Sequence, residues 1–175
     1  MKIRIALFTA ALLSVAPSYS YAECKDNLVS STPAVRFVHQ DQGTVVDTAS
    51  GLVWMRCAQG FDWDGTTCLA TEDSKEFTWT EALQLAENYQ FAGETDWRLP
   101  NKNELASIVE RRCFAPAIEA TVFPNTPVNS FWSNTPNYFN VSFAWAVNFD
   151  LGEHTTTRRS NLLAVRLVRD FSPID

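Results

Sequence analysis

The chain has 175 residues, of which 46% are hydrophobic and 13% aromatic, and its formal net charge is −6 at pH 7. This length suits a single domain with a sizeable apolar core. The negative charge argues against nucleic acid or an anionic membrane as the main partner, because both require a basic surface. Four arginines near the C-terminus are therefore interpreted as ordinary surface and edge-strand residues: Arg158, Arg159, Arg166 and Arg169.

Residues 1–22 have the pattern of a secretory signal peptide. Lys2 and Arg4 give a positive start, residues 5–15 are nearly all apolar, and small residues lead to a predicted cleavage after Ala22. The apolar run is too short to span a bilayer, and no later segment is long and apolar enough to do so. We therefore expect an exported protein of 153 residues, whose charge becomes −8 when Lys2 and Arg4 are removed.

All four cysteines follow the predicted cleavage point, and an even number in an exported chain favours disulfides over free thiols. Four cysteines allow three pairings, and the sequence alone does not fix which forms. The spacing favours Cys57 with Cys68, closing a short loop rich in turn residues, and Cys24 with Cys113, tying the N-terminus to the body. Loop entropy assigns about 3 and about 4.5 kcal/mol to these two bridges.

Motifs for metals and cofactors are weak, and we expect neither. A zinc site is the alternative use of the cysteines, but no Cys-x-x-Cys pair exists and His39 and His154 lack ligand spacing. The sequence DWDG at residues 62–65 has its glycine at position four, whereas a calcium loop of the EF-hand type needs it at position six, so we expect a turn. The six glycines are scattered, which argues against a phosphate-binding loop.

The first half of the mature chain contains strands and then two helices. Residues 23–34 read as an extended lead-in, and residues 35–175 as one domain. Residues 36–57 predict a hairpin or meander that turns at residues 47–51, and residues 58–68 predict a loop closed by a disulfide. Two capping boxes start the helices, Thr78 with Glu81 and Asn101 with Glu104. Their apolar faces comprise Trp79, Leu83, Leu85 and Ala86 in the first helix and Leu105, Ile108 and Val109 in the second.

After Cys113 the pattern changes to prolines, turns and short strands. Strands are expected in SFWSN (residues 130–134), FAWAVNFD (143–150) and LLAVRLVR (162–169), and apolar residues alternate from Val141 to Phe149. Strands, then two helices, then further strands predict an α+β domain, rich in loops, with short antiparallel strands.

The stretch DWRLPNKNEL (residues 96–105) is interpreted as architecture rather than chemistry. Pro100 restricts Leu99 and blocks an earlier helical turn. Trp97 and Leu99 are spaced to point the same way from a strand, so Arg98 faces the other side, where a carboxylate partner would hold it.

Signals for catalysis are weak, and we expect a protein that is not an enzyme. The cysteines are expected to be oxidised, and neither histidine adjoins a nucleophile motif. Carboxylates are present, but their spacing selects no pair for acid–base work.

Aromatic residues give the positive signal. The chain has six tryptophans, twelve phenylalanines and four tyrosines. For Trp54, Trp79, Trp97 and Trp145 we expect a place in the core. Residues 130–140 are different, because aromatic rings beside amides are a common way to hold a sugar. The predicted ligand-binding residues are Trp132, Asn134, Asn137, Tyr138, Asp150 and Arg158.

Several motifs occur in an order that resembles the Lcl C-terminal domain family. They include GTVVDTASGLVWMRC, the DWRLPNKNEL block, CFAPAIEATVFPN, FWSNTPN and LLAVRLVR, and the resemblance spans residues 35–169. Members are exported bacterial domains, and the family is similar in fold to C-type lectin-like domains and to formylglycine-generating enzymes. The resemblance implies a C-type lectin-like fold and, from a collagen-like adhesin, binding to sulfated glycosaminoglycans.

The chain departs from these relatives in ways that bear on function. It has no collagen-like repeat, and its charge suits a polyanion poorly. No cysteine follows Cys113, so the enzyme group's cysteine pair has no counterpart, and the calcium-and-sugar tripeptides of true C-type lectins are missing. We expect an adhesin-like binding module, in the periplasm or at the cell surface, that recognises a glycan or a surface protein. The alternatives are a structural subunit of a fibre or pilus and a hydrolase or modifying enzyme on the same scaffold.

Overall fold

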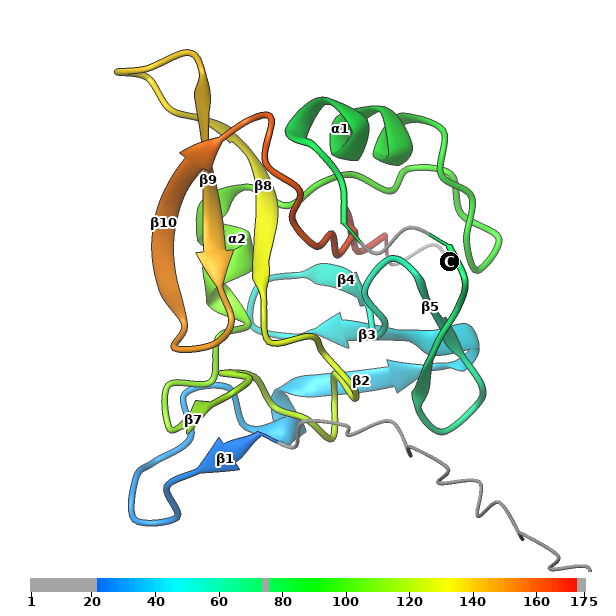
Figure 1. Ribbon diagram of the computed structural model, residues 1–175. Helices are drawn as coiled ribbons and strands as arrows, with labels where there is room; N and C mark the ends of the chain where they lie inside the picture. The colour runs from blue at the N-terminus through cyan, green and yellow to red at the C-terminus, as the bar shows by residue number, and fades with distance from the viewer. Residues whose placement is uncertain (1–21, 74–75, 173–175) are drawn as a thin grey trace, which may run out of the picture.

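The computed structural model describes residues 22–73 and 76–172 as a mixed α and β structure made mostly of strands (Figure 1). The helices in this part are α1 (Trp79–Glu87) and α2 (Lys102–Ser107). Its strands are β1 (Glu23–Cys24), β2 (Phe37–Gln40), β3 (Thr44–Asp47), β4 (Leu52–Met55), β5 (Phe61–Trp63), β6 (Cys68–Ala70), β7 (Cys113–Phe114), β8 (Ser130–Pro136), β9 (Phe143–Asn148), β10 (Glu153–Arg158) and β11 (Val168–Asp170). None of the helices in the described part has the length and apolar character needed to cross a membrane. The predicted signal peptide lies, apart from Ala22, outside the described residues.

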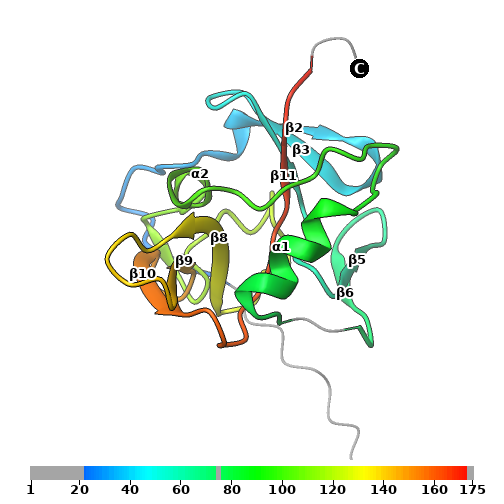
Figure 2. The same cartoon turned by 90° about the horizontal axis from the view of Figure 1, so that it is seen from above.

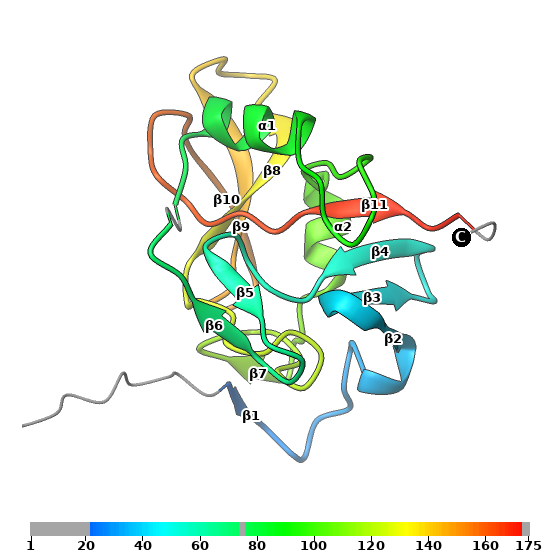
Figure 3. The ribbon, with the colours of Figure 1, turned by 90° about the vertical axis from the view of Figure 1, so that its right-hand side faces the viewer.

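An antiparallel sheet in the order β11-β4-β3-β2 is the largest in the fold (Figure 3). The meander predicted for residues 36–57 is confirmed as β2, β3 and β4. Asp47 ends β3 and makes the turn, because its carboxylate accepts hydrogen bonds from the Ala49 N–H (3.0 Å) and the Ser50 hydroxyl (2.6 Å). Arg36 forms an ion pair with the same carboxylate, which is therefore buried without being left unpaired.

Apolar side chains project from both faces of this sheet, and the described residues form a hydrophobic cluster on each side. Strand alternation sends Val45 and Trp54 to the first cluster, with Phe123 and Ile118, and sends Val53 and Met55 to the second. The second cluster lies under α1 and contains Trp97, Leu99, Trp132, Ala82 and Ala86. Core positions are thus confirmed for Trp54 and Trp97, whereas Trp79 and Trp145 are half-buried.

A three-stranded antiparallel sheet, β10-β9-β8, stands beside the first (Figure 1). The strands expected in residues 130–134 and 143–150 are confirmed as β8 and β9. The sequence did not reveal β10, because Glu153–Arg158 is a polar edge strand without an apolar alternation. β9 is covered on both faces, since Ala144 and Ala146 are buried as fully as Val147.

The strand predicted for residues 162–169 is wrong in extent. Only Val168–Asp170 forms a ladder strand, while residues 163–167 run buried between the two sheets and make single bridges. The prediction for Arg166 is also wrong, because this side chain is fully buried and not on the surface. Its Nη1 donates to the carbonyls of Met55 (2.8 Å) and Arg56, and its Nη2 donates to Thr126 Oγ1 (2.7 Å). Burial, with the nearby Arg56 cation, lowers the pKa of Arg166 to about 9, so the guanidinium is still charged at neutral pH.

Both predicted capping boxes are confirmed. Thr78 Oγ1 accepts from the Glu81 N–H (3.3 Å), while the Glu81 carboxylate accepts from the Thr78 N–H (2.8 Å). Asn101 Oδ1 accepts from the Glu104 N–H (2.9 Å), and Glu104 accepts from the Asn101 N–H (2.7 Å). Viewed from above, α1 lies between β8 on one side and the β5–β6 hairpin on the other (Figure 2).

Both predicted disulfides, Cys24–Cys113 and Cys57–Cys68, are present. Each cysteine in the described part is bonded in this way, so none is available as a thiolate ligand for zinc. The loop expected at residues 58–68 contains strand β5, and β5 pairs with β6 in a small hairpin. The turn expected at DWDG is present, since the Asp64 carboxylate accepts the N–H groups of Thr66 (2.8 Å) and Thr67 (2.7 Å).

The lead-in is fastened to the body around one buried carboxylate. Glu110 is fully buried, and it accepts hydrogen bonds from the Ser30 hydroxyl, from the N–H groups of Ser31 (3.0 Å) and Thr32 (2.9 Å), and from the Arg112 N–H (3.1 Å). Burial alone would raise the pKa of this carboxyl, but the hydrogen bonds, led by the one from Ser30, outweigh it. They lower the pKa from its ordinary 4.5 to about 2.

We predict that Glu110→Gln lowers the free energy of unfolding by about 3 kcal/mol at neutral pH, the value that corresponds to this pKa difference. The folded pKa lies below the unfolded one. The stabilisation is therefore complete above about pH 4.5 and is lost as the pH falls toward 2. Urea unfolding at several pH values measures both effects. Glu153→Gln, at an exposed position of β10, serves as the control and should leave the acid slope unchanged. An equal acid slope in wild type and Glu110→Gln would contradict the assignment.

Candidate functional site

The DWRLPNKNEL block makes the local contacts predicted for it. Arg98 holds Glu104 through two hydrogen bonds, from Nη1 (2.9 Å) and Nη2 (3.0 Å), so Glu104 is the predicted carboxylate partner; Nη2 also reaches Asp170 (2.8 Å). Trp97 and Leu99 point the opposite way and are buried. The backbone of Arg98 pairs with Val168 (2.9 and 3.0 Å), which sets Trp97 beside the next residue of β11, Arg169.

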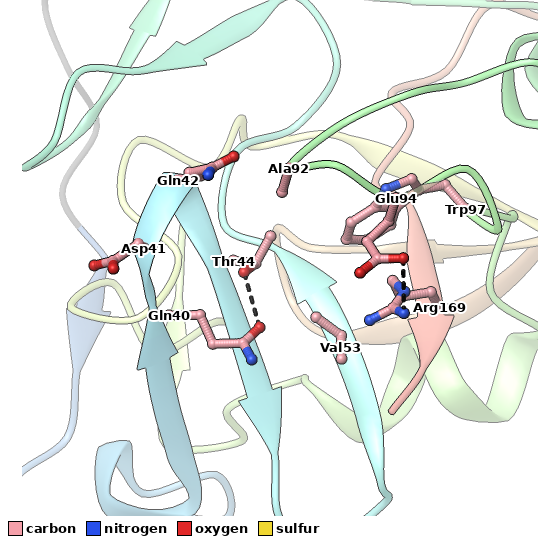
Figure 4. A pocket seen from close by; sticks show the side chains of 9 residues that line it. All are labelled: Gln40, Asp41, Gln42, Thr44, Val53, Ala92, Glu94, Trp97 and Arg169. Carbon is pink, nitrogen blue, oxygen red and sulfur yellow. Dashed lines mark hydrogen bonds and ion pairs between the residues drawn. The ribbon is translucent and has the colours of Figure 1, made fainter. Parts of the chain in front are cut away.

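A hollow of about 210 Å³ opens at this place, between the sheet and the loop that follows α1 (Figure 4). Strand residues form its floor, the loop forms one wall, and the turn between β2 and β3 forms the rim. Its lining consists of Gln40, Asp41, Gln42, Thr44, Val53, Ala92, Glu94, Trp97 and Arg169. Two residues of the lining, Gln42 (φ 65°) and Ala92 (φ 55°), have left-handed backbone conformations, which are uncommon for residues other than glycine and concentrate at functional sites.

Several polar groups of this pocket are held by hydrogen bonds and ion pairs. Arg169 is nearly buried, contrary to the surface position predicted for it, and it binds Glu94 (3.1 Å) and Asp96 (2.7 Å). Thr44 donates to Gln40 Oε1 (3.0 Å), and Trp97 Nε1 donates to the Phe91 carbonyl (3.0 Å). Two carboxylates on one arginine make the site unattractive to anions. The amides, the hydroxyl and Glu94 suit a small ligand with hydroxyl or amino groups.

The six predicted ligand-binding residues fall into two groups in the structure. Trp132 is a correction: its side chain is fully buried in the second cluster, and its Nε1 donates to the Phe77 carbonyl (2.7 Å). A ring that packs α1 against the sheet has no face left for a ligand. Asn134 is half-buried and donates from Nδ2 to the Leu99 carbonyl (3.2 Å). Asp150 follows β9 at its far end, away from Tyr138, and is half-buried.

Asn137 and Tyr138 lie at the tip of the β8–β9 hairpin, which projects beyond the body of the protein (Figure 1), whereas Arg158 lies beside its stem, at the end of β10. Tyr138 is 90% exposed, and the sequence reading missed its neighbours Phe139 (94%) and Val141 (77%). The rings of Tyr138 and Phe139 meet edge to face, with centroids 5.5 Å apart at 84°. Asn137 Oδ1 accepts the Phe139 N–H (2.9 Å) and the Asn140 N–H (3.3 Å), so the tip is an ordered turn. The sequence signal for an exposed aromatic tip is a pair of adjacent aromatic residues between two asparagines that form turns.

Cations lie along the stem of this hairpin. Arg158 pairs with Phe143 in the ladder, and its guanidinium carbon is 5.3 Å from that ring. Lys102 stands over the Trp145 ring at 4.2 Å. By contrast, no charged residue occurs from Ser130 to Phe149 in the sequence. The hairpin thus presents an uncharged apolar tip on a stem flanked by positive charge.

For the pocket, we predict that Arg169→Lys lowers the free energy of unfolding by about 1 kcal/mol. A lysine ammonium cannot engage Glu94 and Asp96 in the paired geometry of a guanidinium, and both carboxylates are partly exposed, which limits the loss. Urea unfolding measures the change, and amide hydrogen exchange should become faster in residues 91–96. Arg111→Lys, at an exposed position, is the matched control. Unchanged exchange in residues 91–96 would show that the ion pairs do not hold the loop.

Comparison with known proteins agrees with the motif order. The family model described as the Lcl C-terminal domain matches residues 43–169, a span that includes the DWRLPNKNEL block and the β8–β9 hairpin. No curated protein matches the sequence. Because the match covers well over half of the chain, the protein belongs to the Lcl C-terminal domain family.

Proposed function

We propose that the protein is an exported, adhesin-like binding module, not an enzyme, that docks onto a protein surface through the tip of its β8–β9 hairpin. The observation that carries this proposal is the exposure of Tyr138, Phe139 and Val141 on an ordered turn. Large apolar side chains exposed together are unfavourable in water unless a partner covers them. Export is supported by the two disulfides together with the signal peptide predicted at residues 1–22.

The geometry of the tip favours a protein over a glycan as the partner. A sugar stacks on a flat ring face with free amides beside it, whereas the Tyr138 and Phe139 rings stand at 84° to each other. The carbonyl oxygen of the Asn137 amide is occupied by backbone N–H groups. A tyrosine and a phenylalanine with an arginine nearby match the composition of protein–protein hot spots, and Arg158 supplies that arginine at the stem.

The architecture included in this proposal is C-type lectin-like. Its support is the combination of two helices, short antiparallel strands, two disulfides and long connecting loops. In such a scaffold, loops and hairpin tips vary while the core is kept, so a binding surface at the end of a hairpin is consistent with the fold.

To test the proposed function, the Tyr138→Ser/Phe139→Ser double variant is compared with wild type for saturable binding to protein-bearing bacterial surfaces. We expect at least a 30-fold loss of affinity, corresponding to about 2 kcal/mol for hot-spot side chains. The fold should be unchanged, because both side chains lie outside the core. Leu151→Ser, an exposed apolar residue in the turn between β9 and β10, is the matched control and should bind as wild type does.

A photo-crosslinking residue at position 138 then identifies what the tip touches. A single crosslinked protein, lost after protease treatment of the surface, supports the proposal. Unaltered binding by the double variant would contradict it. So would binding to protein-free lipid vesicles or purified glycans that depends on the same two residues.

A further inference from the structure

We propose that a second surface, a groove beside α1, binds a basic amphipathic peptide segment of a partner protein. Two adjoining hollows form this groove, one of about 590 Å³ and one of about 280 Å³. They share Phe77 and Leu85, so they make one continuous surface. It runs from the α1–Leu162 side to the β5–β6 hairpin, whose position beside α1 is visible in Figure 2.

The floor of the groove is apolar because Phe77, Leu85 and Tyr89 pack against the second cluster and stay partly exposed on their outer side. Ala82 and Ala86 face the second cluster, while Leu85 lies between them on the helix and stays half-buried at the groove. Phe77 is fixed by two backbone hydrogen bonds with Leu163 (2.8 and 3.0 Å), which bring the neighbouring Leu162 alongside. The apolar residues of the floor are Phe61, Phe77, Leu85, Tyr89 and Leu162, and Leu162 is 55% exposed.

Charge decides which partner fits this floor. Among the described residues that line the two hollows, all the charged ones are acidic: Asp62, Asp73, Glu76 and Glu81. Each is exposed, so these four side chains place negative charge along the described part of the rim. An acidic peptide or a nucleic acid would be repelled, while lysines and arginines would be attracted.

A peptide that carries apolar side chains on one face and basic side chains at the edges satisfies both features. Its apolar residues, spaced as i, i+3, i+4 and i+7 on a helix, would lie on Phe77 and Leu85. Its basic residues would meet the carboxylates on either side, from the β5–β6 hairpin and from the start of α1. The exposed Gln84 amide in the lining adds hydrogen-bonding groups for the peptide's polar edge.

This inference goes beyond the proposed function, because the groove shares no lining residue with the hairpin tip. The proposal for the groove and the proposal for the hairpin tip can therefore each be wrong while the other is right. The protein is expressed with residues 1–22 in place and purified after export. It is then titrated by isothermal calorimetry with two synthetic peptides of about 14 residues, which is long enough for about four helical turns. One has a helical Leu/Lys pattern, and the other has the same pattern with glutamate in place of lysine.

We expect the Leu/Lys peptide to bind and the Leu/Glu peptide to give no signal. Affinity for the Leu/Lys peptide should fall at least tenfold between about 50 and about 300 mM salt, because charge pairs on an exposed rim are screened. The triple variant Asp62→Asn/Asp73→Asn/Glu76→Gln should lose at least tenfold at low salt. Glu81 is left in place because it caps α1.

Matched variants separate this site from overall charge and from the hairpin. Glu23→Gln/Asp26→Asn/Glu153→Gln removes the same charge from exposed positions outside the groove and should change affinity less than twofold. Leu162→Ser should weaken binding, whereas Tyr138→Ser/Phe139→Ser should not. Equal affinity for the two peptides, or an equal loss in both triple variants, would overturn the proposal.

Discussion

The two-pronged pairing of Arg98 with Glu104 is the interaction on which the arrangement of the other elements depends. Glu104 also caps α2 through the Asn101 N–H, so one carboxylate fixes both the end of an extended segment and the start of a helix. With Arg98 held outward, Trp97 and Leu99 must enter the second cluster. The backbone bridge to Val168 then aligns β11 and places Arg169 against the loop that carries Glu94 and Asp96. A change of register here would move every one of these side chains to the other face.

Two of the fully buried charges, Glu110 and Arg166, mark the places where loops are fastened to the core, and they do not pair with each other. The Glu110 carboxylate is surrounded by hydroxyls and N–H groups of the lead-in, whereas the Arg166 guanidinium is surrounded by carbonyls and the Thr126 hydroxyl. A buried charge is costly unless its hydrogen bonds are made, so misplaced arrangements of these loops are strongly disfavoured. Buried charges of this kind select one loop conformation, whereas apolar packing alone would allow several. In this protein much of the chain between the strands is irregular loop.

Local signals in the sequence predicted the features that depend on a few adjacent residues. The capping boxes, the Asp47 turn, the hairpin strands and the in-and-out order of Trp97, Arg98 and Leu99 all belong to this class, and the two disulfides followed from spacing. Burial of individual side chains did not follow, because it is decided by segments far away in the sequence. Trp132 and Tyr138 stand six residues apart in one aromatic stretch, yet Phe77 and the second cluster enclose the first and nothing encloses the second. The acidic rim of the groove was likewise not predicted. Its carboxylates come from separate segments, the β5–β6 hairpin and the start of α1 among them, and no single sequence motif contains them all.

The Cys24–Cys113 bridge has a mechanical consequence. It joins residues 89 apart in sequence, and both helices and the meander β2–β4 lie inside the closed loop, whereas the β8–β9 hairpin lies outside it. Tension applied between the N-terminal end and the hairpin tip would pass through the bridge instead of along those 89 residues. The chain that such a load can extend is then only the segment from Cys113 to Tyr138. When the protein is pulled between Cys24 and its hairpin, it can therefore lengthen by only a short segment, because the covalently closed part is outside the line of tension.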